Sequence, residues 1–221
     1  AGVSVGPDGG SHQAVEDIAI VRVIPNITVF TPCDVIEAEK ATRLSLTDQI
    51  KTPVYIRLAR EKTPVITTAE TPFDPLHAEY YFIPSPEILE KNDGHLSVGI
   101  IAMGSLVFNA LKAAAQLEKE GFAVKVLNIH TVKPIDTERI CELAQDAGCL
   151  VTVEEHQIIG GLGGAVAETI TAKLNRPVPI EFIGMHDQFG QSGKPAELIK
   201  HYGMSIEHIV AAAKKAIERK G

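Results

Sequence analysis

The chain has 221 residues, of which 45% are apolar, and its net charge is −7. This size fits one large domain or two small ones with a sizeable core. Because no basic stripe could follow a phosphate backbone, we expect no nucleic-acid partner. The longest apolar stretches are far shorter than the roughly 20 residues of a membrane span, and no secretory signal opens the chain, so we expect no membrane partner. The cysteines have neither CxxC spacing nor an even number, which indicates buried thiols in a reducing compartment, the cytoplasm: Cys33, Cys141 and Cys149.

Residues 1–62 predict two strands and two helices behind a glycine-rich loop. Ser11 is the expected N-cap of the first helix, and Pro25 ends it. Asp34 and Glu37 form a capping-box pattern that opens the second helix. The expected elements are the loop (1–12), a helix (13–24), a strand (27–30), a helix (34–46) and a strand (53–59).

Residues 63–93 contain five prolines and no sustained period, so we expect a long linker on the surface with at most a short strand near 80–83. From Leu96 onward, strand and helix patterns alternate, which predicts a mostly parallel sheet with helices on both faces. The expected strands are 96–104, 123–129, 149–155 and 179–184, and the expected helices are 106–120, 137–147, 165–174 and 206–220.

The first unit is too small for a complete domain of this type. A parallel sheet of two strands cannot cover both faces or protect its edges. The chain also begins with Ala1 rather than methionine. We therefore expect that part of this domain lies on another polypeptide or has been lost. The fold class is an incomplete parallel-sheet α/β domain followed by a mostly parallel, three-layer α/β domain.

The loop GPDGGSHQ, residues 6–13, is the first candidate site. Its glycines allow close approach of a ligand, and Asp8 can accept hydrogen bonds from hydroxyl groups. His12 is expected at a helix start, where the positive end of the dipole favours a neutral imidazole. A histidine beside a carboxylate suits proton transfer on a hydroxylated substrate. The alternative is a tight glycine turn with a capping Ser11 and an incidental histidine.

The stretch YIRLARE places Arg57 and Arg60 at the end of a buried strand. Ligands of α/β sheets bind beyond the carboxyl ends of strands, and a guanidinium there suits phosphate or carboxylate. A surface ion pair with Glu61 is the alternative interpretation.

A second glycine-rich stretch, EEHQIIGGLGGAVAE, spans residues 154–168. Amides at this helix start could bind an anion, but the spacing does not match a dinucleotide fingerprint. Close packing against another subunit is the favoured interpretation. The remaining histidines have no metal-ligand spacing and are expected to be structural or exposed: His77, His95, His130, His156, His186, His201 and His208.

Two longer blocks carry a resemblance to a family. The segment GPDGGSHQAVEDIAIVRVIPNITVFTPCD follows the pattern G-x-D-G-x-[ST]-H-Q-x-x-E, then R-x-[IL]-P-N and a strand that ends in P-x-D. The tail DQFGQSGKPAELIKHYGMSIEHI is the second block. Together with YIRLARE, they resemble the later part of transketolases in the same order over nearly the whole chain.

The resemblance implies residues 1–75 as the later part of a pyrimidine-binding domain, 76–95 as a linker and 96–221 as the transketolase C-terminal domain. Transketolases transfer a two-carbon ketol unit from a ketose phosphate to an aldose phosphate, in the pentose phosphate pathway. They use thiamine diphosphate and a divalent metal, Mg²⁺ or Ca²⁺. Asp8 matches the residue that recognises a substrate hydroxyl, His12 the histidine that contacts the substrate oxygen and transfers protons, and Arg60 the phosphate-binding arginine.

The family also needs a glutamate and aromatic residues around the aminopyrimidine ring, and a domain for metal and diphosphate, and none of these has a counterpart in this sequence. We therefore expect the chain alone to bind no cofactor and to need an N-terminal transketolase region or subunit, within a homodimer. Three alternatives stay open: deoxyxylulose phosphate synthase, the β subunit of a 2-oxoacid dehydrogenase, and a noncatalytic dimerisation module. Gln13 and the FGQSG tail favour transketolase.

Overall fold

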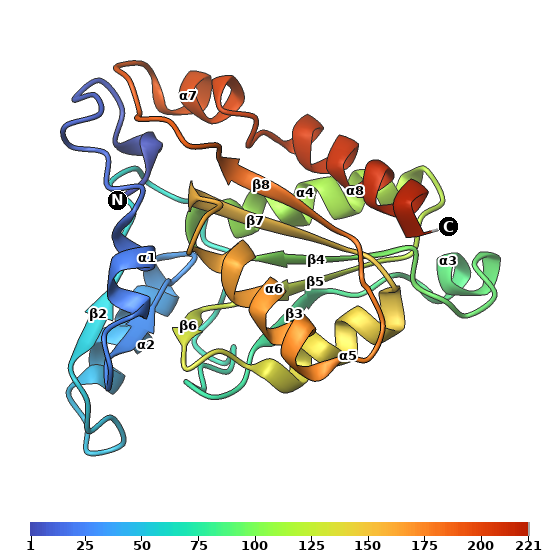
Figure 1. Ribbon diagram of the computed structural model, residues 1–221, viewed down its shortest axis with the longest axis horizontal. Helices are drawn as coiled ribbons and strands as arrows, with labels where there is room; N and C mark the ends of the chain where they lie inside the picture. The colour runs from blue at the N-terminus through green and yellow to red at the C-terminus, as the bar shows by residue number, and fades with distance from the viewer. Residues whose placement is uncertain (221) are drawn as a thin grey trace.

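The computed structural model describes residues 1–220 and contains two β-sheets with helices packed around them (Figure 1). The larger sheet has the order β3-β5-β4-β7-β8, and the smaller has the order β2-β1-β6. The strands are β1 (Thr28–Phe30), β2 (Val54–Ile56), β3 (Glu79–Phe82), β4 (Val98–Ala102), β5 (Val124–Asn128), β6 (Thr131–Lys133), β7 (Leu150–Gln157) and β8 (Ile180–Met185). The helices are η1 (Val3–Val5), α1 (Asp17–Arg22), α2 (Val35–Ser45), α3 (Pro86–Lys91), η2 (Gly104–Leu106), α4 (Val107–Lys119), α5 (Thr137–Ala147), α6 (Leu162–Lys173), α7 (Pro195–His201) and α8 (Ile206–Lys220).

The larger sheet forms the middle of three layers. Its strands β5, β4, β7 and β8 run parallel, and β3 joins the edge antiparallel to β5. Successive residues of β4 point to opposite faces: Ile100 packs in the cluster with α4 and α8, and Ile101 in the cluster with α5 and α6. Burial on both faces explains why β4 is entirely apolar. The predicted fold class is confirmed.

The smaller sheet gains its third strand from the second half of the chain. Strand β1 pairs with β2 in parallel, as its neighbour in the first unit. On its other side it pairs antiparallel with β6, which lies between β5 and α5. The amide of Thr31 also donates to the carbonyl of His130 at 2.8 Å. The two halves of the chain therefore share a sheet, and no period in a three-residue strand could have predicted it.

The first helix is shorter than expected. It covers Asp17–Arg22, its N-cap is Glu16 rather than Ser11, and Glu16 makes no capping bond with its side chain. The carbonyl groups just before this helix accept hydrogen bonds from elsewhere in the chain: the carbonyl of Ala14 accepts from the amide of Gly2, and the carbonyl of Val15 accepts from the amide of Gln157. These long-range bonds hold the segment in a loop, so the expected helix start at residue 13 is wrong.

The segment 63–93 is more regular than its prolines suggest. It contains the expected short strand as β3, and also helix α3, which has a proline in its first turn. Helix α7 likewise begins at a proline, between the expected strand 179–184 and the expected helix 206–220, where no element was predicted. Both helices are too short to show a helical period, which is why the sequence pattern missed them.

Asp34 caps α2 as predicted, and its Oδ1 accepts from the amides of Ile36 and Glu37. The carboxylate of Glu37 departs from the box pattern because it bonds the amide of Cys33 at 2.8 Å. Within residues 1–220, no helix is both long and apolar enough to cross a membrane.

Candidate functional site

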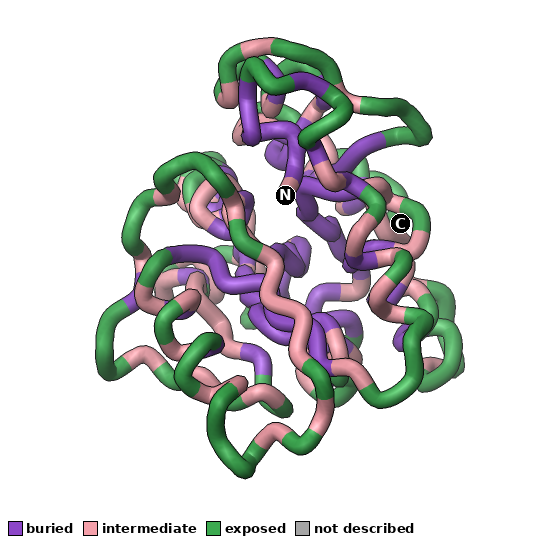
Figure 2. Tube along the Cα trace, turned by 90° about the vertical axis from the view of Figure 1, so that its left-hand side faces the viewer, coloured by how far each residue is buried: buried purple, intermediate pink, exposed green. Residues whose placement is uncertain are grey.

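The loop of residues 6–13 lies beside α7 at one end of the molecule (Figure 1). It follows η1 and contains tight turns, in which the amide of Gly9 donates to the carbonyl of Gly6 and that of His12 to the carbonyl of Gly9. Several of its residues are exposed, including Gly10 and Ser11, in contrast to the buried stretches in the interior (Figure 2). The loop therefore presents polar groups at the surface on a backbone with defined turns.

The structure brings two of the predicted site residues together. The guanidinium of Arg60 donates through Nη1 to Oδ2 of Asp8. Asp8 comes from the glycine loop, and Arg60 follows β2 along the chain. The Arg60 side chain is 59% exposed and that of Asp8 31% exposed, so both can reach a ligand without leaving a buried position. The ion pair of Arg60 is thus with Asp8, and not with Glu61 as in the alternative interpretation.

His12 lies in the same loop and is exposed. Its Nδ1 is 3.0 Å from Oγ of Ser11. Helix α1 begins only at Asp17, so the prediction that His12 sits at the positive end of a helix is wrong. The backbone turn at Gly9, not a helix dipole, determines where this imidazole is presented.

Arg57 has a structural position and does not face a ligand. Its Nε donates to Oδ2 of Asp17 at 2.9 Å, and its side chain is only 9% exposed. Its Nη2 donates to the carbonyls of Ala14 and Glu155, each at 3.0 Å. Although burial raises the pKa of Asp17, the charge and hydrogen bonds of Arg57 outweigh it and lower that pKa. Arg57 therefore anchors the base of the loop, and its predicted role in anion binding is wrong.

The amides of the second glycine-rich stretch bind a carboxyl group of the same chain, that of Glu154. The buried carboxylate of Glu154 accepts from the amides of Leu162 and Gly163 at 2.7 and 2.8 Å. These are the amides at the start of α6, so they are not open to a ligand. Complete burial raises the pKa of Glu154 to about 7.

The glycines of this stretch pack within the chain. A Cβ at Gly161 would lie 2.0 Å from Glu154 Oε2, and one at Gly163 would lie 2.5 Å from the ring of Phe182. These glycines therefore allow close packing within the chain, and the expected packing against another subunit stays a prediction.

Glu155 is an anchor that the sequence reasoning missed. Its carboxylate accepts from the amide of Ser4 and, at 2.7 Å, from the hydroxyl of Ser105. A Cβ at Gly2 would meet its Oε1 at 2.4 Å. The end of β7 thus holds the segment before the glycine loop. Nothing in the sequence pattern connects residues so far apart.

A hollow of about 380 Å³ lies where β1 and β2 end, and its lining includes Ala59 and Glu61, the residues on either side of Arg60. This is the sheet edge at which parallel α/β folds bind ligands. Its lining includes Cys33, whose thiol pKa is raised by burial and by the neighbouring Glu37 carboxylate. The walls of this hollow are Pro32, Cys33, Asp34, Val35, Ala38, Leu58, Ala59, Glu61, Lys62 and Thr63.

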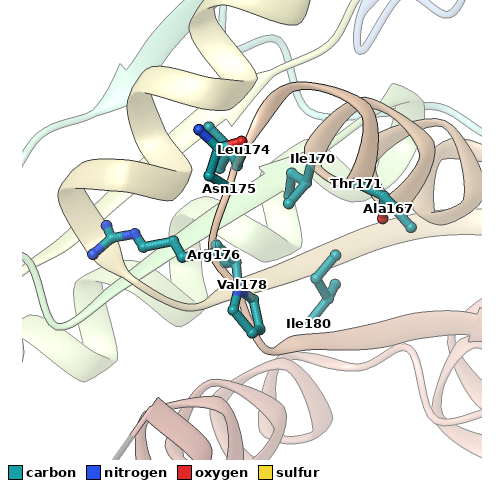
Figure 3. Close-up of a pocket in the computed structure, with 9 residues that line it drawn as sticks. Ala167, Ile170, Thr171, Leu174, Asn175, Arg176, Val178 and Ile180 are labelled. Atoms are coloured by element: carbon teal, nitrogen blue, oxygen red, sulfur yellow. The ribbon is translucent and has the colours of Figure 1, made fainter.

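A second hollow of about 440 Å³ lies between the end of α6 and the start of β8 (Figure 3). Ile170, Leu174 and Val178 line it, and Arg176 is held by donating to the carbonyl of Gln145. Because it lies where the parallel strands begin, it is at the opposite end of the sheet from the usual ligand edge.

The residues of this chain do not fit the metal and diphosphate of the cofactor that the resemblance implies. Among residues 1–220, no group of three or more His, Cys, Asp or Glu side chains could hold a metal ion. The glycine-rich helix start that could have held a diphosphate is satisfied by Glu154.

Comparisons with known proteins match both parts of the chain to one family. The family model described as "Transketolase, pyrimidine binding domain" matches residues 1–65, and "Transketolase, C-terminal domain" matches residues 90–209. A relative described as "Putative transketolase C-terminal section", from Methanocaldococcus jannaschii, is 42% identical over 219 residues. The match covers 99% of this chain and 63% of that protein. The transketolase of Rattus norvegicus is 34% identical, with 99% of this chain and 33% of that protein covered.

Solved structures agree. One titled "Split gene transketolase, inactive beta4 tetramer" is 37% identical with a TM-score of 0.84, over 96% of this chain and 65% of that chain. Transketolase from Leishmania mexicana is 26% identical with a TM-score of 0.75, over 99% of this chain and 29% of that chain. The chain thus spans less than two thirds of these relatives. With both family models matched in order along one fold, the chain belongs to the transketolase family.

Proposed function

We propose that this chain supplies the sugar-phosphate side of a transketolase site, and that a companion region or subunit holds thiamine diphosphate and a divalent metal. One observation carries the proposal: Arg60 contacts Asp8 of the glycine loop that also carries His12, in a chain that matches both transketolase domains. The reaction is transfer of a two-carbon ketol unit from a ketose phosphate to an aldose phosphate. We divide the chain into a pyrimidine-binding part (1–75), a linker (76–95) and a C-terminal domain (96–221).

Arg60 is the proposed phosphate-binding residue. Its planar guanidinium can donate two parallel hydrogen bonds to a phosphate and stays charged at any relevant pH. The contact with Asp8 holds the side chain near the glycine loop before substrate binds. Asp8 retains free acceptor capacity for a substrate hydroxyl, because a carboxylate has about four lone-pair sites.

His12 is the proposed proton carrier. Its imidazole is exposed on a polar loop, where it can contact the substrate oxygen and exchange a proton with it. Ser11 contacts Nδ1, so Nε2 is the nitrogen that we assign to the substrate. His12 therefore binds and moves a proton, while the carbon chemistry belongs to the cofactor on the companion.

Two observations support the need for a companion. Among residues 1–220, no group of three or more His, Cys, Asp or Glu side chains could hold a metal ion, and the helix start of the second glycine-rich stretch is occupied by Glu154. Relatives of similar coverage are described as subunits: the "6-deoxy-6-sulfo-D-fructose transketolase subunit SqwH" of Clostridium sp. is 36% identical, and a subunit of an apulose-4-phosphate transketolase of Phocaeicola vulgatus is 32% identical. We propose a similar subunit role here, in an assembly with two copies of each site.

The test is reconstitution with an N-terminal transketolase subunit, thiamine diphosphate and Mg²⁺. Ketol transfer should need both polypeptides, and His12→Ala should lower kcat by roughly 10²-fold, a typical contribution of general acid–base catalysis. Turnover by this chain alone would contradict the companion. Condensation of pyruvate with an aldose phosphate, without ketol transfer, would instead favour a deoxyxylulose phosphate synthase.

A further inference from the structure

Gln13 is a buried side chain at the end of an exposed loop. It is only 3% exposed. Its Nε2 lies within hydrogen-bond distance of three carbonyl oxygens, those of Val3, Gly6 and Gln191, at 3.0, 3.3 and 3.0 Å. An amide has two hydrogens, so one of them is shared between acceptors. The Oε1 atom has no hydrogen-bond partner among residues 1–220, so the donor side of the amide makes the contacts.

These contacts join the glycine loop to residues 190–193, which precede α7. Val3 lies in η1 and Gly6 at the start of the loop, whereas Gln191 lies in the last fifth of the chain. Tyr202 donates its hydroxyl to the carbonyl of Phe189, the residue just before this segment, at 3.2 Å. The C-terminal part of the chain is thus fastened directly to the loop that carries Asp8 and His12.

The glycines show how closely the two segments fit. A Cβ at Gly9 would lie 2.9 Å from Oγ of Ser192, and one at Gly10 would lie 2.7 Å from the carbonyl oxygen of Gly190. A Cβ at Gly190 would lie 1.8 Å from Oε1 of Gln13. Each segment therefore needs glycine where the other approaches, and their backbones shape each other.

We propose that Gln13 is a positioning residue, and that residues 190–193 act through it to fix the glycine loop in its substrate-binding conformation. This brace gives the C-terminal domain a role in the reaction without any contact with substrate. The catalytic part of the inference rests on the proposed function, whereas the fixing of the loop does not.

The physical reason lies in the composition of the loop. Glycine loses more backbone freedom on ordering than any other residue, so a loop rich in glycine samples many conformations unless it is held. A displacement of about 1 Å at a reacting group can lower the rate roughly 10²-fold. Loss of the brace should therefore affect both loop order and turnover.

Two variants break the brace from opposite sides. Gln13→Met keeps the length of the side chain but removes the donor. Gly190→Ala leaves the loop sequence intact and pushes a methyl group against Oε1 of Gln13. Gly164→Ala is the matched control, because its Cβ would meet only Arg22 and Glu168, at 3.7 and 3.8 Å.

Hydrogen exchange of the full chain gives a readout that does not depend on activity. In both brace variants, the amides of Gly9 and His12 should exchange at least about 10-fold faster, whereas the exchange of β4 amides should not change. In the Gly164→Ala control, the amides of Gly9 and His12 should exchange at the rate of the unsubstituted chain. In the enzyme reconstituted with its companion, kcat/KM should fall by about 10- to 100-fold. The double variant should be no worse than Gln13→Met alone, because the two changes break one contact.

The outcomes separate the two proposals. Unchanged loop exchange in Gly190→Ala overturns the brace, and so does faster exchange with kcat/KM equal to that of the unsubstituted enzyme. If Gln13→Met does not fold, Gly190→Ala alone decides. If the unsubstituted, reconstituted enzyme shows no ketol transfer, the proposed function fails while loop exchange still tests the brace.

Discussion

Replacing Asp34 by asparagine should show how strongly one carboxylate ties Ile66 and Thr67 to the start of helix α2. Its Oδ1 caps α2, and its Oδ2 accepts from the amides of Ile66 and Thr67 at 2.8 and 2.7 Å. The Thr67 hydroxyl donates to it as well. In Asp34→Asn, the cap can remain, but an NH₂ group replaces Oδ2 and faces two backbone donors.

The expected cost follows from those two lost bonds. A hydrogen bond to a charged group contributes about 1.5–3 kcal/mol, and a buried donor without a partner is expensive. We expect the free energy of unfolding to fall by about 3 kcal/mol, the lower end for two such bonds. Urea unfolding measures it, with the exposed Asp48→Asn as the control. A loss below about 1 kcal/mol, the value of an ordinary surface change, would refute this reasoning.

The same variant has a pH signature. Burial raises the pKa of Asp34, but the hydrogen bonds from Glu37, Ile66 and Thr67 outweigh it and lower the pKa in the folded state. A carboxyl with a lowered folded pKa stabilises the fold above its unfolded pKa of about 4 and loses that contribution as pH falls through the folded pKa. The stability difference between the native chain and Asp34→Asn should therefore be full at pH 7 and shrink below pH 4.

Three other changes have expected outcomes. In the reconstituted enzyme, Arg60→Ala should lower kcat/KM for phosphorylated acceptors by roughly 10- to 100-fold and leave kcat/KM for unphosphorylated acceptors nearly unchanged. Steady-state kinetics with both kinds of acceptor test this, and an equal loss for both would contradict a role in phosphate binding. Because burial raises the pKa of Glu154 to about 7, a carboxyl ¹³C titration should show a midpoint near neutrality, and a midpoint below pH 4.5 would contradict the burial argument. The Glu154 carboxyl binds its proton more tightly in the folded chain, so its contribution to the free energy of unfolding should decline as pH rises from about 4.5 to 7. Gly161→Ala, at the N-cap of α6, should lower the free energy of unfolding by about 1–3 kcal/mol because its Cβ would overlap the Glu154 carboxylate. Gly164→Ala, inside α6, should raise it by about 0.5–1 kcal/mol. Equal effects of the two changes in urea unfolding would argue against the packing at Gly161.

Elements with a full amphipathic period and a cap could be predicted from the sequence. Helix α5 has the expected bounds, and α2 begins at the predicted Asp34 cap. By contrast, β6, α3 and α7 are three to seven residues long, and they exist because distant parts of the chain hold them. A short segment has no period to read, so its structure depends on partners that only the folded chain provides.

The candidate site divides in the same way. Residue types in local motifs identified Asp8, His12 and Arg60 as candidates, and the structure brings Asp8 and Arg60 into contact. The position of Arg57 could not be predicted because its partners, Asp17 and Glu155, lie 40 and 98 residues away along the chain. Gln13 served in the sequence only to favour one family over another, because its contact with Gln191 crosses most of the chain.

The borrowed strand β6 has a consequence for synthesis on the ribosome. Strand β1 cannot complete its pairing until Thr131 and Lys133 have emerged from the exit tunnel, although β2 follows it closely. Domains generally fold in order from the N-terminus during translation, but this sheet keeps an open edge while the next unit is still being made. A nascent chain arrested before residue 131 should leave Val29 open to protease, and one arrested after the second unit is complete should protect it. The first domain therefore depends on the second for its timing as well as for its third strand.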